Sequence, residues 1–360
     1  MSEEMPPGPL RYGWTTGACA AAAAKAAYAA LLTGDFPDPV TITLPRGETP
    51  AFALARHELF ADHATATIVK DAGDDPDVTH GALVSSTVRR GAPGSGVTYK
   101  AGEGVGTVTK PGLPLPVGEP AINPGPRAQI AAAIAEVATR HGAPGDVEVT
   151  VSIADGEAIA RKTLNGRLGI VGGLSVLGTT GIVVPFSCSA WIHSIHRGID
   201  VARAQGLQHI AGATGSASEA AVAKLYGLEE AALIDMGDFV GGMLKYVRVH
   251  PVPRVTIAGG FAKITKLGQG LLDLHSRAGP VDLRWLAERV EELGGAREVA
   301  DAVAQANTAI EALEIAGAAG LDLPPLVARY ARETAVKVLR DSEVALDIAI
   351  FGRDGNLLAR

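Results

Sequence analysis

A rhythm of short apolar strands, glycine-containing turns and helical stretches constrains this 360-residue chain more than any other feature. Three such units follow one another: HIAGATG before SASEAAVAKLYG, AALIDMGD before FVGGMLKYVRVH, and RVTIAGGFAKI before TKLGQGLLDL. Strand, turn and helix in repeated succession are typical of a parallel sheet with helices packed on its faces. We therefore predict a Rossmann-like parallel α/β domain over residues 171–360.

The first half of the chain shows a different pattern. An alanine-rich run from Ala18 to Leu32 predicts a helix that Thr15 or Thr16 caps and Gly34 ends. Strand-like alternation follows in VTITL (40–44) and ATATIV (64–69), and a second helix is expected over 127–141. These elements predict an α+β domain over residues 1–170, with the boundary between 164 and 178.

Turn residues mark the other segments. Residues 91–126 hold so many Gly and Pro that we expect a long shaped loop there, and such loops are often functional. A hairpin is expected to turn at Asp155-Gly156, between VEVTVSI and EAIARKT. Helices are expected over 281–340, and a final strand or hairpin turns at Asp354-Gly355, in a sheet that the sequence leaves open.

Composition narrows the class of protein. The chain is 47% hydrophobic and 20% charged, as in ordinary folded proteins, and its net charge of -7 argues against a general grip on nucleic acid. Apolar runs are too short to span a membrane, the first ten residues do not resemble a secretory signal, and two cysteines exclude a disulfide framework. We expect a cytoplasmic protein with no membrane or nucleic-acid partner. A homo-oligomer is left open.

Three successive strand ends in the second half suggest a nucleoside site. Ligands of open parallel sheets lie beyond the carboxyl ends of the strands, where glycines allow close approach and an acid can hold ribose hydroxyls. The motif GATG is not GxGxxG, which argues against NAD. The plainer interpretation is that glycine simply ends strands. The candidate cofactor-binding residues are Gly212, Thr214, Gly215, Asp235, Met236, Asp238, Gly259 and Gly260.

An acidic loop, KDAGDDPDVTHG (70–81), offers a proton acceptor. Its aspartates are crowded, so at least one is expected to have a raised pKa, and such a carboxylate suits acid–base chemistry. We name Asp71, Asp74 and Asp75 as catalytic candidates. Asx turns around Pro76 are an equal alternative.

Other polar features have plainer interpretations. The Thr15-Thr16-Gly17 turn offers N–H groups at the positive end of a helix, although plain capping is more common. Cys19 is expected to be a small buried thiol. His193 and His196 share a helix face, but no third ligand lies nearby, so no metal site is predicted.

Several long blocks resemble one family. RYGWTTG (11–17) followed by ACAAAAAKAA is similar to the opening of the cobalt-precorrin-5B C1-methyltransferases, the CbiD family of cobalamin biosynthesis. The acidic loop resembles that of the family as well. The other matching blocks are GEGVGTVTKPGL (102–113), EPAINPGPR (119–127), NGRLGIVGGLSVLGTTGIV (165–183) and HPVPRVTIAGGFAKITKLGQGLLDLHS (250–276).

The resemblance implies methyl transfer from S-adenosylmethionine to carbon 1 of cobalt-precorrin-5B, giving cobalt-precorrin-6A. The first domain would bind the corrinoid and the second the methyl donor, and the cobalt would belong to the substrate. A non-catalytic tetrapyrrole or nucleotide carrier is the alternative, and a nicotinamide oxidoreductase a weaker one. Cations and N–H groups are expected to bind the substrate carboxylates. The candidates are Thr15, Thr16, Gly17, Lys70, Asn123, Arg127 and Arg167.

Overall fold

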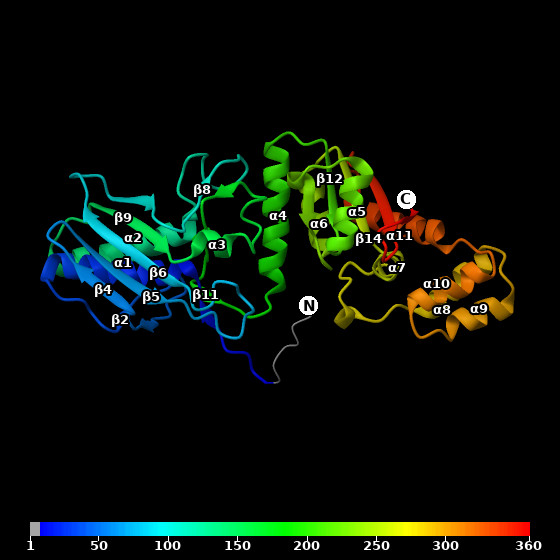
Figure 1. Ribbon diagram of the computed structural model, residues 1–360, viewed down its shortest axis with the longest axis horizontal. Coiled ribbons are helices and arrows are strands. Elements are labelled where there is room, and N and C mark those ends of the chain that lie inside the picture. Colours follow the sequence, from blue (N-terminus) through cyan, green and yellow to red (C-terminus); the bar gives the residue numbers. More distant parts are fainter. Residues whose placement is uncertain (1–7) are drawn as a thin grey trace. The chain divides into compact units, whose positions relative to one another are not determined.

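The computed structural model describes residues 8–360 and divides the chain into two compact units, which meet in sequence at Ser187 and Cys188 (Figure 1). This boundary lies later than the predicted one at 170/171. The reason is strand pairing within the first unit: Ile170–Val171 (β10) pairs with Thr107–Val108 (β8), and Ile182–Val183 (β11) pairs with Gly13–Trp14 (β1). The glycine-rich segment that the sequence assigned to the second domain therefore belongs to the first.

A mixed five-stranded sheet in the order β4-β5-β6-β9-β7 forms the centre of the first unit. Neighbouring strands are antiparallel except β7, which runs parallel to β9. A two-stranded pair, β2 and β3, lies outside this sheet. The strands are β2 (Val40–Thr41), β3 (Ala51–Phe52), β4 (Arg56–Leu59), β5 (His63–Val69), β6 (Leu83–Arg90), β7 (Val97–Ala101) and β9 (Val147–Ile153).

Two 18-residue helices, α1 (Thr16–Thr33) and α2 (Pro124–His141), pack together on one face of this sheet (Figure 1). The Oγ1 of Thr15 accepts from the N–H of Ala18 at 3.2 Å and caps α1, and Gly34 ends it in a left-handed conformation. Every residue from Thr16 to Leu31 is buried. Alanine permits this because it has high helix propensity and lets neighbouring backbone approach closely.

The opposite face of the sheet carries hydroxyl side chains. Thr65 and Thr87 lie opposite each other with their Oγ1 atoms 2.8 Å apart, and Thr67 and Ser85 repeat this pairing at 2.8 Å. Alternation along the strands places small apolar residues such as Ala64 and Ala66 towards the helices, where Ser86 also lies with its Oγ donating to the carbonyl of Ala20.

The predicted hairpin at Asp155-Gly156 is wrong. Residues 156–160 form a short helix, α3 (Gly156–Ala160), instead of a strand. Both edges of β9 are already taken by β6 and β7, so no edge is left for a returning strand. The 91–126 segment is also more regular than expected, because β7 and β8 lie within it.

A five-stranded sheet in the order β13-β12-β14-β15-β16 forms the centre of the second unit. Its first four strands are parallel, and β16 pairs antiparallel with β15 through the predicted turn at Asp354-Gly355. The C-terminal hairpin therefore joins the parallel sheet. The strands are β12 (His209–Ala213), β13 (Leu233–Asp235), β14 (Arg254–Gly260), β15 (Ala345–Phe351) and β16 (Leu357–Ala359).

Helices cover the two faces of this sheet unequally. On one face, α5 packs alone against small side chains such as Ala211, Ala258 and Ala349. Larger residues such as Ile210, Ile257 and Ile348 face the helices on the other side. The helices are α4 (Cys188–Ala204), α5 (Ser216–Tyr226), α6 (Val240–Val249), α7 (Phe261–Gly268), α8 (Leu283–Glu292), α9 (Arg297–Ala304), α10 (Ala309–Ala318) and α11 (Leu323–Leu339).

Chain order reverses beside β12. The connection through α5 leads from β12 to β13 on one side, and the connection through α6 then crosses to β14 on the other side of β12. Consecutive loops thus diverge at the carboxyl ends of β12 and β14, which is where open α/β sheets place their ligand crevice. None of the helices in the described range, 8–360, is long and apolar enough to span a membrane.

Candidate functional site

The three predicted strand ends lie next to one another at the carboxyl edge of the second sheet. The N–H of Thr214 donates to the carbonyl of Ala258 at 3.0 Å, and the N–H of Gly237 donates to the carbonyl of Ala213 at 3.0 Å. These bonds join the ends of β12, β13 and β14. The structure thus brings the cofactor candidates together, while their binding of a ligand stays a prediction.

These candidates differ in accessibility. Gly215 is exposed, and Thr214 and Gly260 are half-buried. Gly212 and Met236 are buried, and a Cβ at Gly212 would lie 2.3 Å from the Sδ of Met243. Gly212 therefore makes room for a methionine. Gly259 is likewise buried, against the side chain of Thr214.

Two lysines of α7 approach this edge of the sheet and were missed in the sequence. Lys263 forms an ion pair with Asp238, whose side chain is 17% exposed. Lys266 is buried, and its Nζ donates to the carbonyls of Leu274 and His275 at 3.2 Å each. Burial lowers the pKa of Lys266. Their i, i+3 spacing in KITK directly after a predicted strand end was the available signal.

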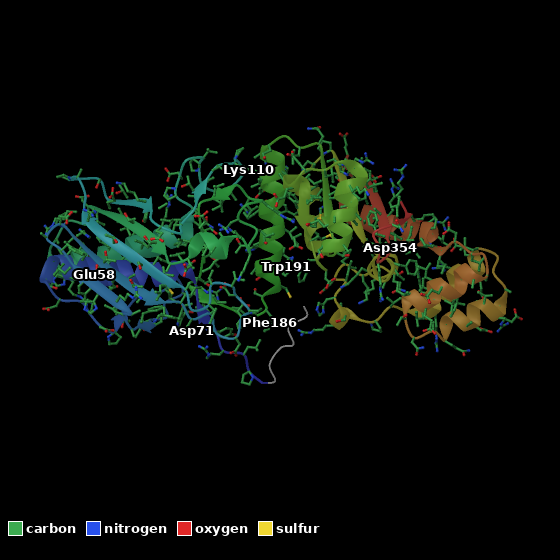
Figure 2. The ribbon with its side chains drawn as sticks, in the orientation of Figure 1. Glu58, Asp71, Lys110, Phe186, Trp191 and Asp354 are labelled. Atoms are coloured by element: carbon green, nitrogen blue, oxygen red, sulfur yellow. The ribbon has the colours of Figure 1, made fainter. Side chains whose placement is uncertain are left out.

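Trp191 of α4 is a further residue that the sequence reasoning missed. Its Nε1–H donates to the carbonyl of Asp235 at 3.1 Å, yet 47% of the residue is exposed. Figure 2 labels it on α4. The sequence places one of the chain's three tryptophans in an expected helix, but it does not show what that indole contacts.

The acidic loop of the first unit is held by hydrogen bonds. Asp71 pairs with the guanidinium of Arg11, and Asp74 accepts from the Arg11 backbone N–H at 2.6 Å. The hydrogen bond from Arg11, with a second from the N–H of Gly73, lowers the pKa of Asp71. Asp71 is thus not the aspartate with a raised pKa that the loop was expected to contain, because its neighbours are donors and not only other aspartates.

The remaining acids of this loop are bound as well. Asp75 accepts from the N–H of Phe186 at 2.8 Å, and Asp77 pairs with Lys70 at 2.7 Å. Burial alone would raise the pKa of Asp77. The Lys70 ammonium and hydrogen bonds from Lys70 and Thr79 outweigh burial and hold this pKa below its ordinary value. Asp71 and Phe186 are labelled in Figure 2.

The Thr15-Thr16-Gly17 turn is buried, and the N–H groups of Thr15 and Gly17, which were expected to be available to a ligand, already bond within the protein. The N–H of Gly17 donates to the carbonyl of Leu177 at 3.0 Å, and the Oγ1 of Thr16 accepts from the N–H of Leu177 at 3.0 Å. The backbone of Leu177 thus occupies the polar groups of the turn that were expected to bind a ligand. Burial raises the pKa of the Cys19 thiol to about 12, in keeping with a structural role.

Among the remaining cationic candidates, Lys70 is only 2% exposed. Arg127 donates to Glu119 and to the carbonyl of Ile122 at 2.8 Å each, and its guanidinium lies 5.1 Å from the ring centre of Tyr99. The geometry therefore gives Arg127 a framework role. Asn123 is the N-cap residue of α2, but its side chain forms no capping hydrogen bond. Arg167 is half-buried in the turn before β10.

Three exposed apolar side chains lie on the segments that pair with or bond to the chain around the buried turn. Tyr12 and Val184 flank the β1–β11 pair and are 61% and 50% exposed, and Leu177 is 49% exposed. Exposed apolar side chains that gather in one patch often mark a binding surface. We call Tyr12, Leu177 and Val184 the apolar corner.

Neither histidine of the predicted i, i+3 pair reaches a third metal ligand in the described part of the chain, where no group of three His, Cys, Asp or Glu side chains converges. His196 instead stacks on Tyr246 with ring centres 3.9 Å apart, and burial lowers its pKa.

Comparison with known proteins decides the family. The sequence model of CbiD matches residues 3–185, and that of the CbiD C-terminal domain matches residues 273–360. The chain belongs to the CbiD family. The strand ends of the candidate cofactor site lie between these two matched segments.

Relatives in the CbiD family match almost the whole chain. A protein from Bradyrhizobium sp. named cobalt-precorrin-5B C(1)-methyltransferase is 63% identical, covering 98% of this chain and 94% of the relative. Proteins of the same name from Methylorubrum extorquens and Agrobacterium fabrum are each 62% identical over 98% of this chain and over 98% and 93% of their own length.

A solved structure also matches. It is a cobalamin biosynthesis protein (cbiD) from Archaeoglobus fulgidus, 25% identical, with a TM-score of 0.40, covering 87% of this chain and 86% of that chain.

Proposed function

We propose that this chain transfers a methyl group to carbon 1 of cobalt-precorrin-5B, giving cobalt-precorrin-6A in cobalamin biosynthesis. The observation that carries the proposal is identity of 56–63% over at least 97% of the chain to proteins of that name. The composition fits a cytoplasmic enzyme. The cobalt is part of the substrate.

The methyl donor would be S-adenosylmethionine, bound at the carboxyl edge of the second sheet. This assignment treats the second unit as a Rossmann-like nucleoside-binding domain. In its favour, the backbone is accessible at Gly215 and Gly260, which lie at the ends of β12 and β14, where the chain order reverses. Asp235 ends the neighbouring strand, β13, where a carboxylate can hold ribose hydroxyls. Asp238, which pairs with Lys263, is the second acid at this edge of the sheet.

When bound, the donor supplies a methyl carbon already activated by a positively charged sulfur. The protein's part is then to hold donor and ring carbon in line and to exclude water, which is catalysis by proximity and orientation. No covalent intermediate on the protein is needed. We assign no general base to the acidic loop, since its described carboxylates serve hydrogen bonds within the first unit.

The first unit would bind the corrinoid through the apolar corner. A macrocycle presents a wide apolar face, and exposed Tyr12 and Leu177 can pack against such a face. The buried Thr15-Thr16-Gly17 turn supports this surface from below, since Gly17 and Thr16 bond to Leu177. Arg167 and Asn123 remain proposed partners of the substrate carboxylates.

Mass spectrometry tests the proposed reaction. Incubation with S-adenosylmethionine and cobalt-precorrin-5B should add one methyl group, about 14 Da, to the corrinoid, at a rate that depends on the protein. Deuterium in the donor methyl should appear in the product. A carrier would bind the corrinoid and leave its mass unchanged, and that outcome would reject the enzymatic proposal.

A further inference from the structure

Trp191 is an exposed aromatic side chain that the protein nevertheless holds in place. Its Nε1–H donates to the carbonyl of Asp235 at 3.1 Å. A Cβ at Gly237 would lie 3.3–3.4 Å from the indole atoms Cζ2, Cε2 and Nε1, so the ring edge lies directly on the Gly237 backbone. The hydrogen bond and this close packing fix the indole, although 47% of the residue faces solvent.

Its position relates Trp191 to the candidate cofactor site. Asp235 is the last residue of β13, and the N–H of Gly237 donates to the carbonyl of Ala213 at the end of β12. Because β13 is the edge strand, the sheet ends there and α4 packs beside it. A nucleoside with its ribose at Asp235 and its tail over Thr214 would therefore direct its base past β13, towards Trp191.

We propose that Trp191 is the stacking surface for the adenine of the methyl donor. This inference rests on the proposed function and adds a specificity-determining residue to it. Every nucleobase has a π-face that stacks on an indole, and a fixed indole loses little entropy when it does so. We assign adenine to the indole because adenine is attached to the ribose, and Asp235 is the proposed partner of the ribose hydroxyls. Loss of the indole should weaken binding about 10- to 100-fold.

Fluorescence tests the inference without any turnover. The chain has three tryptophans, so Trp14→Phe with Trp285→Phe leaves Trp191 as the sole indole. Titration with S-adenosylhomocysteine and with adenosine should quench its emission saturably, and homocysteine should not. The matched variant Trp191→Phe, with Trp14 and Trp285 kept, should show no such quenching.

Calorimetry on the full chain separates the outcomes. Trp191→Ala should bind S-adenosylhomocysteine about 10- to 100-fold more weakly, and Trp191→Phe, which keeps an aromatic face, should lose less. Binding of S-adenosylhomocysteine to the single-tryptophan protein without quenching would overturn the inference and leave the proposed function standing. Quenching by the corrinoid but not by adenosine would also overturn it. Failure of wild-type protein to bind S-adenosylhomocysteine would reject the donor site itself.

Discussion

The backbone N–H of Phe186 donates a 2.8 Å hydrogen bond to Oδ1 of Asp75, 111 residues earlier in the chain. Phe186 has a φ of 55°, in the left-handed region that a bulky residue rarely adopts. Asp75 thus helps hold an unfavourable backbone turn. A carboxylate that holds a backbone turn has a structural role. Substitutions in the acidic loop should therefore affect stability more than the rate of methyl transfer.

Asparagine substitutions test the acidic loop. Asp71→Asn, Asp74→Asn and Asp75→Asn each keep an acceptor oxygen for the donors that the loop binds. We expect each variant to retain near wild-type turnover in the methyl-transfer assay. A loss of about 10²- to 10⁴-fold in rate with normal thermal stability would instead identify a general base. Asp75→Ala, which removes the acceptor, should lower the free energy of unfolding by about 1–3 kcal/mol.

Acid stability should depend on Asp77. The pKa of Asp77 is depressed in the folded protein. The ionised carboxylate therefore adds to the free energy of unfolding above the ordinary aspartate pKa of about 4, and this stabilisation is lost as pH falls through the lower pKa of the folded state. Asp77→Asn leaves the buried Lys70 ammonium without its counter-charge and should destabilise the protein at neutral pH. Denaturant unfolding from pH 7 down to 3 should show a smaller loss of stability with acid in this variant than in wild type.

The ribose assignment is tested at two acids. Asp235→Ala should weaken the binding free energy of S-adenosylhomocysteine by about 1–3 kcal/mol if a charged hydrogen bond is lost. Asp238→Ala should have a smaller effect, similar to that of Lys263→Met, because these two side chains pair with each other. Calorimetry measures all three. Unchanged binding in both aspartate variants means that the donor lies elsewhere.

Gly13 should resist substitution. A Cβ there would lie 2.0 Å from the backbone carbon of Ala72, and backbone cannot move away as a flexible side chain can. Gly13→Ala should therefore lower Tm by several degrees, in line with overpacking that costs about 1–3 kcal/mol. Gly145→Ala is the control, since its Cβ would have no neighbour closer than 3.9 Å. Equal Tm values for the two variants would contradict the close contact.

The apolar corner should act on the substrate alone. Tyr12→Ala and Leu177→Ala remove exposed side chains, so folding stability should change little. Corrinoid binding, followed by absorbance titration, should weaken, while calorimetric binding of S-adenosylhomocysteine stays the same. Arg127→Ala is the contrasting variant: loss of its bonds to Glu119 and Ile122 should lower Tm. If the corner variants bind the corrinoid normally, the substrate surface lies elsewhere.

Local pattern was enough to predict the parallel sheet, because strand, turn and helix each depend on neighbours a few residues away. It also predicted that the ends of β12, β13 and β14 meet. It could not show that Asp71 pairs with Arg11, 60 residues earlier, or that Leu177 covers Gly17. Such partners depend on long-range packing. Because of them, residues that were predicted to contact a ligand bond to other parts of the protein instead.

Trp191 became a candidate only once the sheet order was known. Its segment resembles any amphipathic helix until β13 is seen to be the edge strand that α4 covers. The same holds for Lys266, whose burial depends on the loop that contains Leu274 and His275.

Helix α1 has a consequence for how the chain folds as it is synthesised. It is enclosed by β5, β6 and α2, so the part of its apolar surface that packs on α2 stays uncovered until the ribosome has made residue 141. Until α2 is made, this uncovered surface of an alanine-rich helix is exposed to non-native association. Nascent chains arrested before α2 should bind chaperones and be cleaved readily within α1, and chains that include β9 should be protected.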